Sequence, residues 1–480
     1  MHAETLLDAS DADSAAVAVD EMVAAQRRPQ PRQHPIDTRE KIDRLIMLID
    51  RALTEQVNAI MHHPRFQAME ARWRGLAYTV ATASEAPDVQ VKLISVSWPE
   101  LCRDLEKATD FDQSHLFDLV YNREFGMAGG EPFGILLGDY RVCHGINPEF
   151  GTDDVAAMRF IAGVAAASFA PFLLEARPEL LELDSFCDLD LLPEMTHIFE
   201  SLAFVRWQSL RGIEDSRFLG LLAPRVLIRT PLRPYDRTRI DGFQFEEKIT
   251  AAGTELLWAS PIYAFSRVVV RAFTQSGWFA DLRGAPQDAD GGGLVTDLPT
   301  MHFSTDRPGL AAQPPVEIRL TAAQERAFSD HGLIPVGYAP STPWLVFNAN
   351  PSLHRPMRTT SRIADENARI AAMLQYVLCA SRFAHFLKVM MRDKVGSLGG
   401  PADIEKMIDD WLQRHCLGND DAPNELKAKF PLRAASVSVR EMPGRPGVLG
   451  CVLRLQPHFQ LDDVSASFQL VAEVSTFSEV

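Results

Sequence analysis

The chain has 480 residues, a formal net charge of −16, 46% hydrophobic residues and 23% charged residues. Its length allows several domains, and its composition is that of a globular protein with a real core. The negative charge argues against nucleic acid as the main partner, because phosphate binding needs a basic surface. No apolar run reaches the roughly 18 residues that a membrane-spanning helix needs, and the first residues lack the basic n-region of a signal peptide. We therefore expect a cytoplasmic protein.

The cysteines favour reduced thiols over a disulfide framework or a zinc site. They are irregularly spaced and none forms CxxC. They are Cys102, Cys143, Cys187, Cys379, Cys416 and Cys451.

The N-terminal region is predicted to be a flexible arm followed by helices. Residues 1–35 are rich in Ala, Asp, Gln and Pro, and AVAVDEMVAAQRR within them can form one short helix with Val19, Met22 and Val23 on one face. Residues 36–60 predict a strong helix, with Asp37 or Thr38 as its cap. The apolar stripe of this helix consists of Ile42, Leu45, Ile46, Ile49 and Leu53.

The next stretch, HHPRFQAMEARWRGLAYTV (62–80), predicts a second helix, because Phe66, Met69, Trp73 and Leu76 recur at helical spacing. Two interpretations are open. The large side chains dock the helix on its own domain, or they dock it on another subunit of a larger assembly.

The centre of the chain alternates between strand and helix patterns. VQVKLISVSW (89–98) predicts a strand with a bulge, and residues 133–137 predict a buried strand after a glycine turn. DDVAAMRFIAGVAAASFAPFLLEA (153–176) predicts an alanine-rich helix that packs closely on several sides. A mixed α/β pattern continues to about residue 360.

The C-terminal part predicts helices and then strands. A long helical stretch from Ile363 ends at Gly399-Gly400, and a second helix starts near Pro401. The tail from 430 to 480 predicts a hairpin across the turn PGRPG, with Val437 and Val439 on its first strand and Cys451, Val452 and Leu453 on its second, and then a further strand.

A basic stripe occupies one side of SRFAHFLKVMMRDK, and apolar residues fill the other. The stripe is either a solvated face or a docking surface for acidic groups of another subunit. Its members are Arg382, His385, Lys388 and Arg392.

Motifs for catalysis, nucleotides and metals are missing from the sequence. The glycine-rich stretches EFGMAGGEP and DADGGGLV match neither G-x-G-x-x-G nor G-x-x-x-x-G-K-[ST], and G-x-S-x-G does not occur. His62 and His63 are adjacent, so they cannot share one helix face as metal ligands. We therefore predict a non-enzymatic protein without a cofactor, a catalytic residue or a bound metal.

A set of segments resembles one family, in order, from about residue 40 to the C-terminus. The family is that of the large sheath subunit of the bacterial type VI secretion system, TssC/VipB. The segments are HHPRFQAMEARWRGL, FGILLGDY, FLGLLAPRVLIRTPL, FQFEE, LWASPIYAF, GWFADLRG, GGGLVTDLP, GLIPVGY, SRFAHFLKVMMRDKVGS and VLRLQPHFQLDD.

The resemblance implies an α+β structural protein. It implies a heterodimer with a smaller sheath subunit (TssB/VipA family), a helical polymer of such heterodimers around an inner tube of hexamers, contraction from a baseplate, and disassembly by a AAA+ unfoldase. The domains expected are a flexible arm (1–35), a helical segment that pairs with the small subunit (36–80), a mixed α/β sheath domain (81–360) and a helix-plus-strand sheath domain (361–480).

The resemblance also gives roles to the residues singled out above. Val19, Met22 and Val23 become the unfoldase handle, and the basic stripe becomes a contact to the tube or to a neighbour. The hairpin becomes an inter-subunit strand site. The residues predicted to pack on the small subunit are Leu45, Ile46, Ile49, Phe66, Met69 and Trp73. The alternatives are a sheath protein of a phage-tail-like particle and, more remotely, a mixed α/β enzyme.

Overall fold

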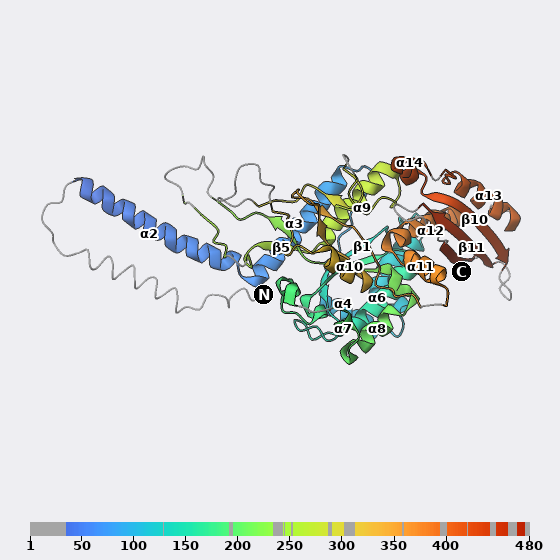
Figure 1. Cartoon of the computed structure of the whole chain (residues 1–480), viewed down its shortest axis with the longest axis horizontal. Helices are drawn as coiled ribbons and strands as arrows, with labels where there is room; N and C mark the ends of the chain where they lie inside the picture. Colours follow the sequence, from blue (N-terminus) through green and yellow to red (C-terminus); the bar gives the residue numbers. More distant parts are fainter. Residues whose placement is uncertain are drawn as a thin grey trace. The chain divides into compact units, whose positions relative to one another are not determined.

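A computed structural model describes most of the chain from residue 35 onward (Figure 1). The described residues are 35–475 without 128, 192–194, 234–242, 244, 251–252, 287–289, 302–312, 358–359, 394–400, 420, 442–447 and 459–467. The chain divides into two compact units. One contains residues up to 63 together with 231–248, and the other contains 64–230 and 249–480.

The first unit is built on a single long helix, α2 (Pro35–Met61), which begins before the two cap residues that the sequence predicts. Ion pairs one turn apart, such as Arg51–Glu55, support its surface. Near its end the buried amide of Asn58 holds the segment 245–248. Asn58 Nδ2 donates to the Glu246 carbonyl oxygen (3.3 Å), and the Lys248 N–H donates to Asn58 Oδ1 (2.9 Å).

The second unit has a four-stranded parallel sheet at its centre, in the order β1–β2–β3–β7. All residues of β2 and β3 are buried. Strands covered on both faces need near-continuous apolar runs, as in LGLLA. FLLEA departs from this at the buried Glu175, which pairs with Arg141. The bounds are β1 (Leu136–Val142), β2 (Phe172–Ala176), β3 (Leu219–Ala223) and β7 (Leu333–Pro335).

Helix α6 (Asp154–Ser168) packs beside this sheet through small side chains. The helix ends earlier than the alanine-rich pattern predicts, because Phe169 adopts a left-handed conformation (φ 51°) and Pro171 follows. The rest of the predicted helix is strand β2. Asp154, at the start of α6, is fully buried, and its Oδ1 accepts a hydrogen bond from Trp98 Nε1 (2.8 Å).

Helix α3 (Pro64–Ser84) lies directly against α9 (Ile262–Ser276). Gly75 makes this possible, because a Cβ atom there would lie 2.3 Å from Tyr263 Cδ2. The Tyr263 hydroxyl donates to Asp139 Oδ2 on β1 (2.8 Å), so the tyrosine links α9 to the sheet.

The strand predicted at 89–98 is not formed in the chain. Residues 88–97 have no helix or strand assignment, and helix α4 (Trp98–Lys107) begins at their end. Period-two alternation in the sequence correctly marks an extended segment, but no strand of the described residues pairs with it.

Smaller elements complete this part of the second unit. Two small sheets form from β4 (Val226–Arg229) with β5 (Leu257–Ala259), and from β6 (Leu294–Val295), β9 (Leu345–Val346) and β8 (Gly337–Tyr338). The remaining helical elements are η1 (Phe111–Gln113), α5 (His115–Phe117), the π-helix η2 (Asp118–Phe125), η3 (Pro178–Leu181), η4 (Phe186–Leu191), α7 (Met195–Phe199), η5 (Leu202–Phe204), α8 (Val205–Arg211), η6 (Glu214–Phe218) and α10 (Ala322–Asp330).

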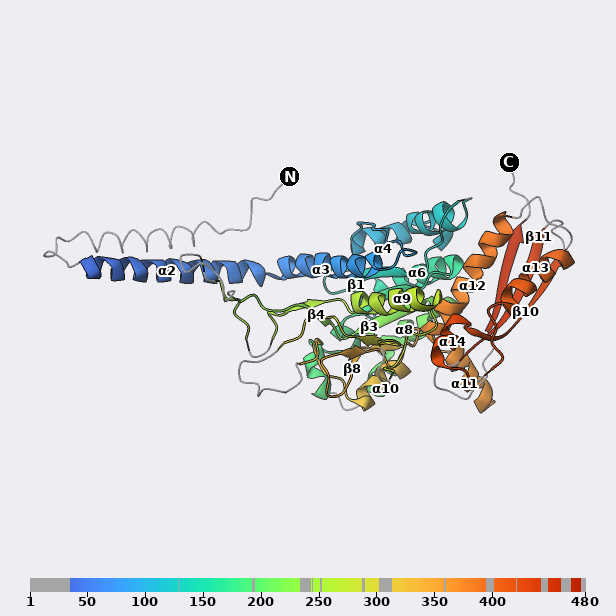
Figure 2. The same cartoon turned by 90° about the horizontal axis from the view of Figure 1, so that it is seen from above.

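The C-terminal region combines helices with an antiparallel sheet in the order β10–β11–β12 (Figure 2). The long helix predicted from Ile363 is in fact two helices, α11 and α12, separated near Met373, which bridges to Pro351. The bounds are α11 (Arg362–Ala371), α12 (Leu374–Asp393), α13 (Pro401–Gln413), α14 (Asn424–Lys429), β10 (Leu432–Glu441), β11 (Val448–Pro457) and β12 (Phe468–Ser475). The chain is thus α+β, as the sequence predicts.

Candidate functional site

The apolar stripe of α2 is exposed to solvent. Leu45, Ile46 and Ile49, the three predicted packing residues on this helix, are each more than one-third exposed, and Ile42 and Leu53 are similar. Monomeric proteins rarely expose such a long row of large aliphatic side chains to water. This helix surface is therefore available for another protein.

Helix α3 packs on its own unit with its small and polar residues, contrary to the interpretation that its large side chains dock it there. Ala71, Gly75 and Thr79 are buried. In contrast, Met69 is 49% exposed and Trp73 is 64% exposed. The close approach at Gly75 explains the reversal, because large side chains would hold α3 away from α9.

Phe66 differs from the other two predicted packing residues of α3. It is only partly exposed, so less of its ring is available to a partner. Met69 and Trp73 remain the open apolar side chains among the predicted residues of this helix.

The predicted basic stripe on α12 faces inward, so the expectation that it forms an exposed surface is wrong for the three side chains the structure describes. His385 is 2% exposed, and its Nε2 lies 2.9 Å from the Ser168 carbonyl oxygen. Arg382 lies over the rings of Phe273 and Phe386, 5.4 Å and 4.5 Å from their centroids. The side chain of Arg392 lies outside the described residues.

Burial changes the pKa values of His385 and Arg382. Burial, together with the nearby charges of Arg382 and Lys388, lowers the pKa of His385 to about 4. Burial also lowers the pKa of Arg382. A neutral, buried His385 stabilises the chain's own packing and has no free surface for the tube or a neighbour in this conformation.

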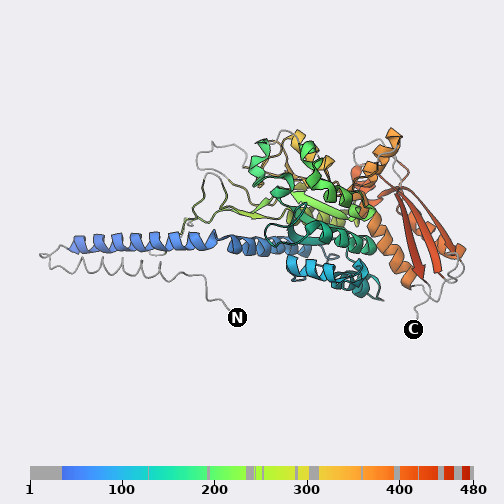
Figure 3. The same ribbon diagram turned by 90° about the horizontal axis from the view of Figure 1, so that it is seen from below.

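The hairpin residues turn their side chains into the chain's own core. Val439, Cys451 and Leu453 are buried, and Val437 packs against the same core. Figure 3 shows α12 and α13 beside this sheet. Only the backbone edges of the sheet are therefore open to another chain's strand.

Val452 lies on the central strand of that sheet. It pairs with Ser438 of β10 and Val471 of β12. The hairpin is thus no lone ribbon, and Val452 does not lie at an edge that an incoming strand could join.

Helix α13 covers part of the outer edge of β10. The Val439 N–H donates to Glu405 Oε2 (2.9 Å), and Gln413 Nε2 donates to the Ala435 carbonyl oxygen (3.3 Å). The sequence analysis missed these two residues. Their spacing of eight, which places them on one face of a helix, was the available signal.

The residues predicted as the unfoldase handle, Val19, Met22 and Val23, lie outside the described residues.

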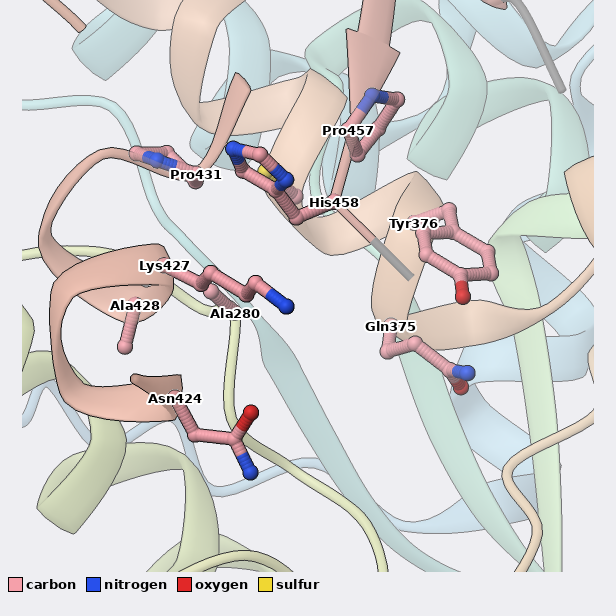
Figure 4. A pocket seen from close by; sticks show the side chains of 10 residues that line it. Ala280, Gln375, Tyr376, Asn424, Lys427, Ala428, Pro431, Pro457 and His458 are labelled. Carbon is pink, nitrogen blue, oxygen red and sulfur yellow. The ribbon is translucent and has the colours of Figure 1, made fainter. Parts of the chain in front are cut away.

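A small hollow lies beside α14 (Figure 4). Its cavity volume is only about 20 Å³, and Tyr376, Lys427 and His458 are among its lining residues. Burial raises the pKa of the Cys379 thiol in its wall to about 12, which keeps this thiol protonated and a poor nucleophile at neutral pH.

The described residues contain no group of three or more His, Cys, Asp or Glu that could bind a metal ion. Within the same residues, no helix combines the length and apolarity required to span a bilayer.

Comparison with known proteins assigns the family. Residues 43–354 match the family model described as EvpB/VC_A0108, tail sheath N-terminal domain, and residues 363–474 match the EvpB/VC_A0108 tail sheath gpW/gp25-like domain. The chain is 34% identical over 447 residues to the type VI secretion system sheath protein TssC1 of Pseudomonas aeruginosa, covering 92% of this chain and 88% of that protein. The chain belongs to the TssC/VipB family of type VI sheath large subunits.

Two solved structures show weaker likeness to this TssC/VipB chain. A chain of the anti-feeding prophage baseplate matches at 12% identity, with a TM-score of 0.34 and coverage of 74% of this chain and 73% of that chain. The sheath tail protein Lin1278 of Listeria innocua matches at 13% identity, with a TM-score of 0.28 and coverage of 68% and 62%.

Proposed function

We propose that this chain is the large structural subunit of a type VI contractile sheath, and that it works as an obligate heterodimer with a small sheath subunit of the TssB/VipA family. The observation that carries the proposal is the exposed apolar row on α2, because a soluble assembly must cover such a row. The family to which the chain belongs indicates that the partner covering this row is a small sheath subunit. Met69 and Trp73 on α3 form a second surface that the small subunit covers.

The heterodimers polymerise around an inner tube of hexamers in the cytoplasm, and the sheath grows from a baseplate. Contraction releases energy held in the lattice contacts and drives effector delivery, so no bond chemistry is required of this chain. The C-terminal sheet joins neighbouring subunits through a backbone edge that α13 does not cover, while its apolar side chains stay in the chain's own core.

The N-terminal segment with Val19, Met22 and Val23 is the handle that a AAA+ unfoldase grips after contraction. An amphipathic helix in an arm can dock into a groove of such a machine. Deletion of residues 1–28 is expected to leave assembly intact and to block disassembly. Normal recycling of sheaths by that variant would move the handle elsewhere.

The test of the main proposal is co-expression with a small sheath subunit of the TssB/VipA family. The chain alone is expected to aggregate, whereas the pair is expected to purify together and to form hollow sheaths in negative-stain micrographs. A chain that forms sheaths without the small subunit would favour the phage-tail-like alternative. A monodisperse monomer that melts cooperatively, with no binding to the small subunit, would overturn the proposal.

A further inference from the structure

Residues 88–97 form an extended surface segment whose backbone is unpaired over most of its length. At its ends, the Val89 N–H donates to the Ala86 carbonyl oxygen (3.1 Å), and the Val96 carbonyl oxygen accepts from the Tyr140 hydroxyl (2.8 Å). Between these contacts, the backbone groups of residues 90–95 make no hydrogen bond to the described part of the chain. Unpaired N–H and C=O groups in an extended row are a template for another strand.

The side chains of this segment have the character of a strand that is normally covered. Val91, Leu93 and Ile94 are 42%, 67% and 55% exposed. Branched aliphatic residues favour a pleated, half-buried surface. In a surface loop these positions would ordinarily be polar, so their exposure here points to a missing neighbour.

The segment is fixed rather than loose. Lys92 contacts the Glu124 carboxylate and lies 5.5 Å from the Phe133 ring centroid. Immediately after the segment, Trp98 is buried and donates to Asp154. A segment already held in its extended conformation loses little further entropy when a strand binds.

The place of the segment in the chain indicates which partner it meets. Helix α3, with the exposed Met69 and Trp73, leads through the turn at 85–88 directly into the segment. The occupant of the α3 surface is therefore the natural source of the strand.

We propose that residues 89–96 accept a β-strand of the small sheath subunit, with main-chain hydrogen bonds providing affinity and Val91, Leu93 and Ile94 packing on apolar side chains of that strand. This rests on the proposed function, which supplies the small subunit.

A proline scan of the co-expressed pair tests the proposal, because neighbouring N–H groups of a strand point to opposite sides. Leu93→Pro and Ile94→Pro are made separately. Both variants lose an apolar side chain, but proline removes a ladder donor at only one of them, so that variant is expected to weaken retention of the small subunit at least about tenfold more than the other. Equal effects, or none, would contradict a ladder.

Hydrogen exchange on the intact pair provides the second readout. The amides of residues 90–95 are expected to show alternating protection. Uniformly fast exchange at 90–95 in a pair that is otherwise stable would overturn this inference and leave the proposed function standing. Protection that appears in sheaths but not in the heterodimer would assign the strand to a second copy of this chain and would also overturn it. Failure of the wild-type pair to form at all would count against the proposed function instead.

Discussion

The Nζ atom of Lys388 lies 3.7 Å from the centroid of the Phe125 ring, and this contact joins α12 to the π-helix η2. The same ammonium donates to the Tyr121 hydroxyl at 2.7 Å. A π-helix is uncommon, and here it presents both aromatic rings to one cation. The charge of Lys388, which the sequence predicts to lie on an exposed basic stripe, therefore stabilises the packing of α12 on η2.

Substitution of this lysine is expected to weaken the fold more than the assembly contacts. Lys388→Met removes a partly desolvated cation–π contact, so we expect the free energy of unfolding to fall by about 1–2 kcal/mol. Denaturant unfolding of the purified heterodimer measures this change. Lys406→Met on the exposed side of α13 is the matched control and is expected to be near neutral. Loss of long sheaths with unchanged stability would instead favour the contact stripe.

His385 is expected to make the stability of the chain depend on pH. Its pKa in the folded state is about 4, below the ordinary value of 6.5, because burial disfavours the charged ring. Between these values the unfolded chain binds a proton that the folded chain does not. Stability is therefore complete above pH 6.5 and falls by up to about 3 kcal/mol as the pH approaches 4.

A variant isolates this effect from that of the other histidines. His385→Gln keeps a donor near the Ser168 carbonyl oxygen but does not titrate, so its loss of stability between pH 7 and 4.5 is expected to be clearly smaller than that of the parent. Superimposable pH profiles from denaturant unfolding would show that His385 does not contribute.

Gly75 is predicted to be intolerant of even one additional methyl group. Alanine in a helix normally adds up to about 1 kcal/mol relative to glycine. At this position its Cβ would overlap the Tyr263 ring, so we expect Gly75→Ala to cost about 1–3 kcal/mol. The double variant with Tyr263→Leu is expected to recover part of that loss, although it gives up the hydrogen bond to Asp139. Thermal melts of the co-expressed pair measure both, and a stabilised Gly75→Ala would contradict the close packing.

The sequence predicts the kinds of element better than it predicts which side of each element is buried. Period-two alternation correctly marks 89–98 as extended, but pairing depends on another strand, which local sequence does not encode. Helical spacing correctly finds α3, but it joins α11 and α12 into one helix. It does not reveal that Gly75 places the face of α3 with small side chains against α9. It also does not reveal that Lys388 contacts Tyr121 and Phe125. Those outcomes depend on residues far apart in the chain.

The exposed side chains of α3 are expected to contribute directly to binding of the small subunit. A large apolar side chain contributes roughly 1.5–3 kcal/mol when it becomes fully buried. Trp73→Ser is therefore expected to raise the dissociation constant of the heterodimer by about tenfold to a hundredfold. Ala77→Ser, exposed on the same helix, is the control and is expected to leave binding unchanged. Unchanged affinity of Trp73→Ser, measured with a labelled small subunit, would remove Trp73 from the interface.

The outer edge of β10 is predicted to be protected by α13. Glu405 accepts the outward N–H of Val439, and Gln413 donates to the outward carbonyl of Ala435, so two of the groups that an incoming strand would use are already satisfied. The double variant Glu405→Ala, Gln413→Ala exposes both groups, and exposed strand edges promote association. We expect faster amide exchange at Val439 and more self-association of the heterodimer in sedimentation runs below the concentration at which the parent assembles.

Glu405→Gln is the matched control, because its side-chain oxygen still accepts the Val439 N–H. Val452→Pro serves as a contrasting variant, since it interrupts the central strand and is expected to destabilise the chain itself rather than change one edge. If the double variant assembles like its parent and exchange at Val439 is unchanged, α13 does not protect this edge.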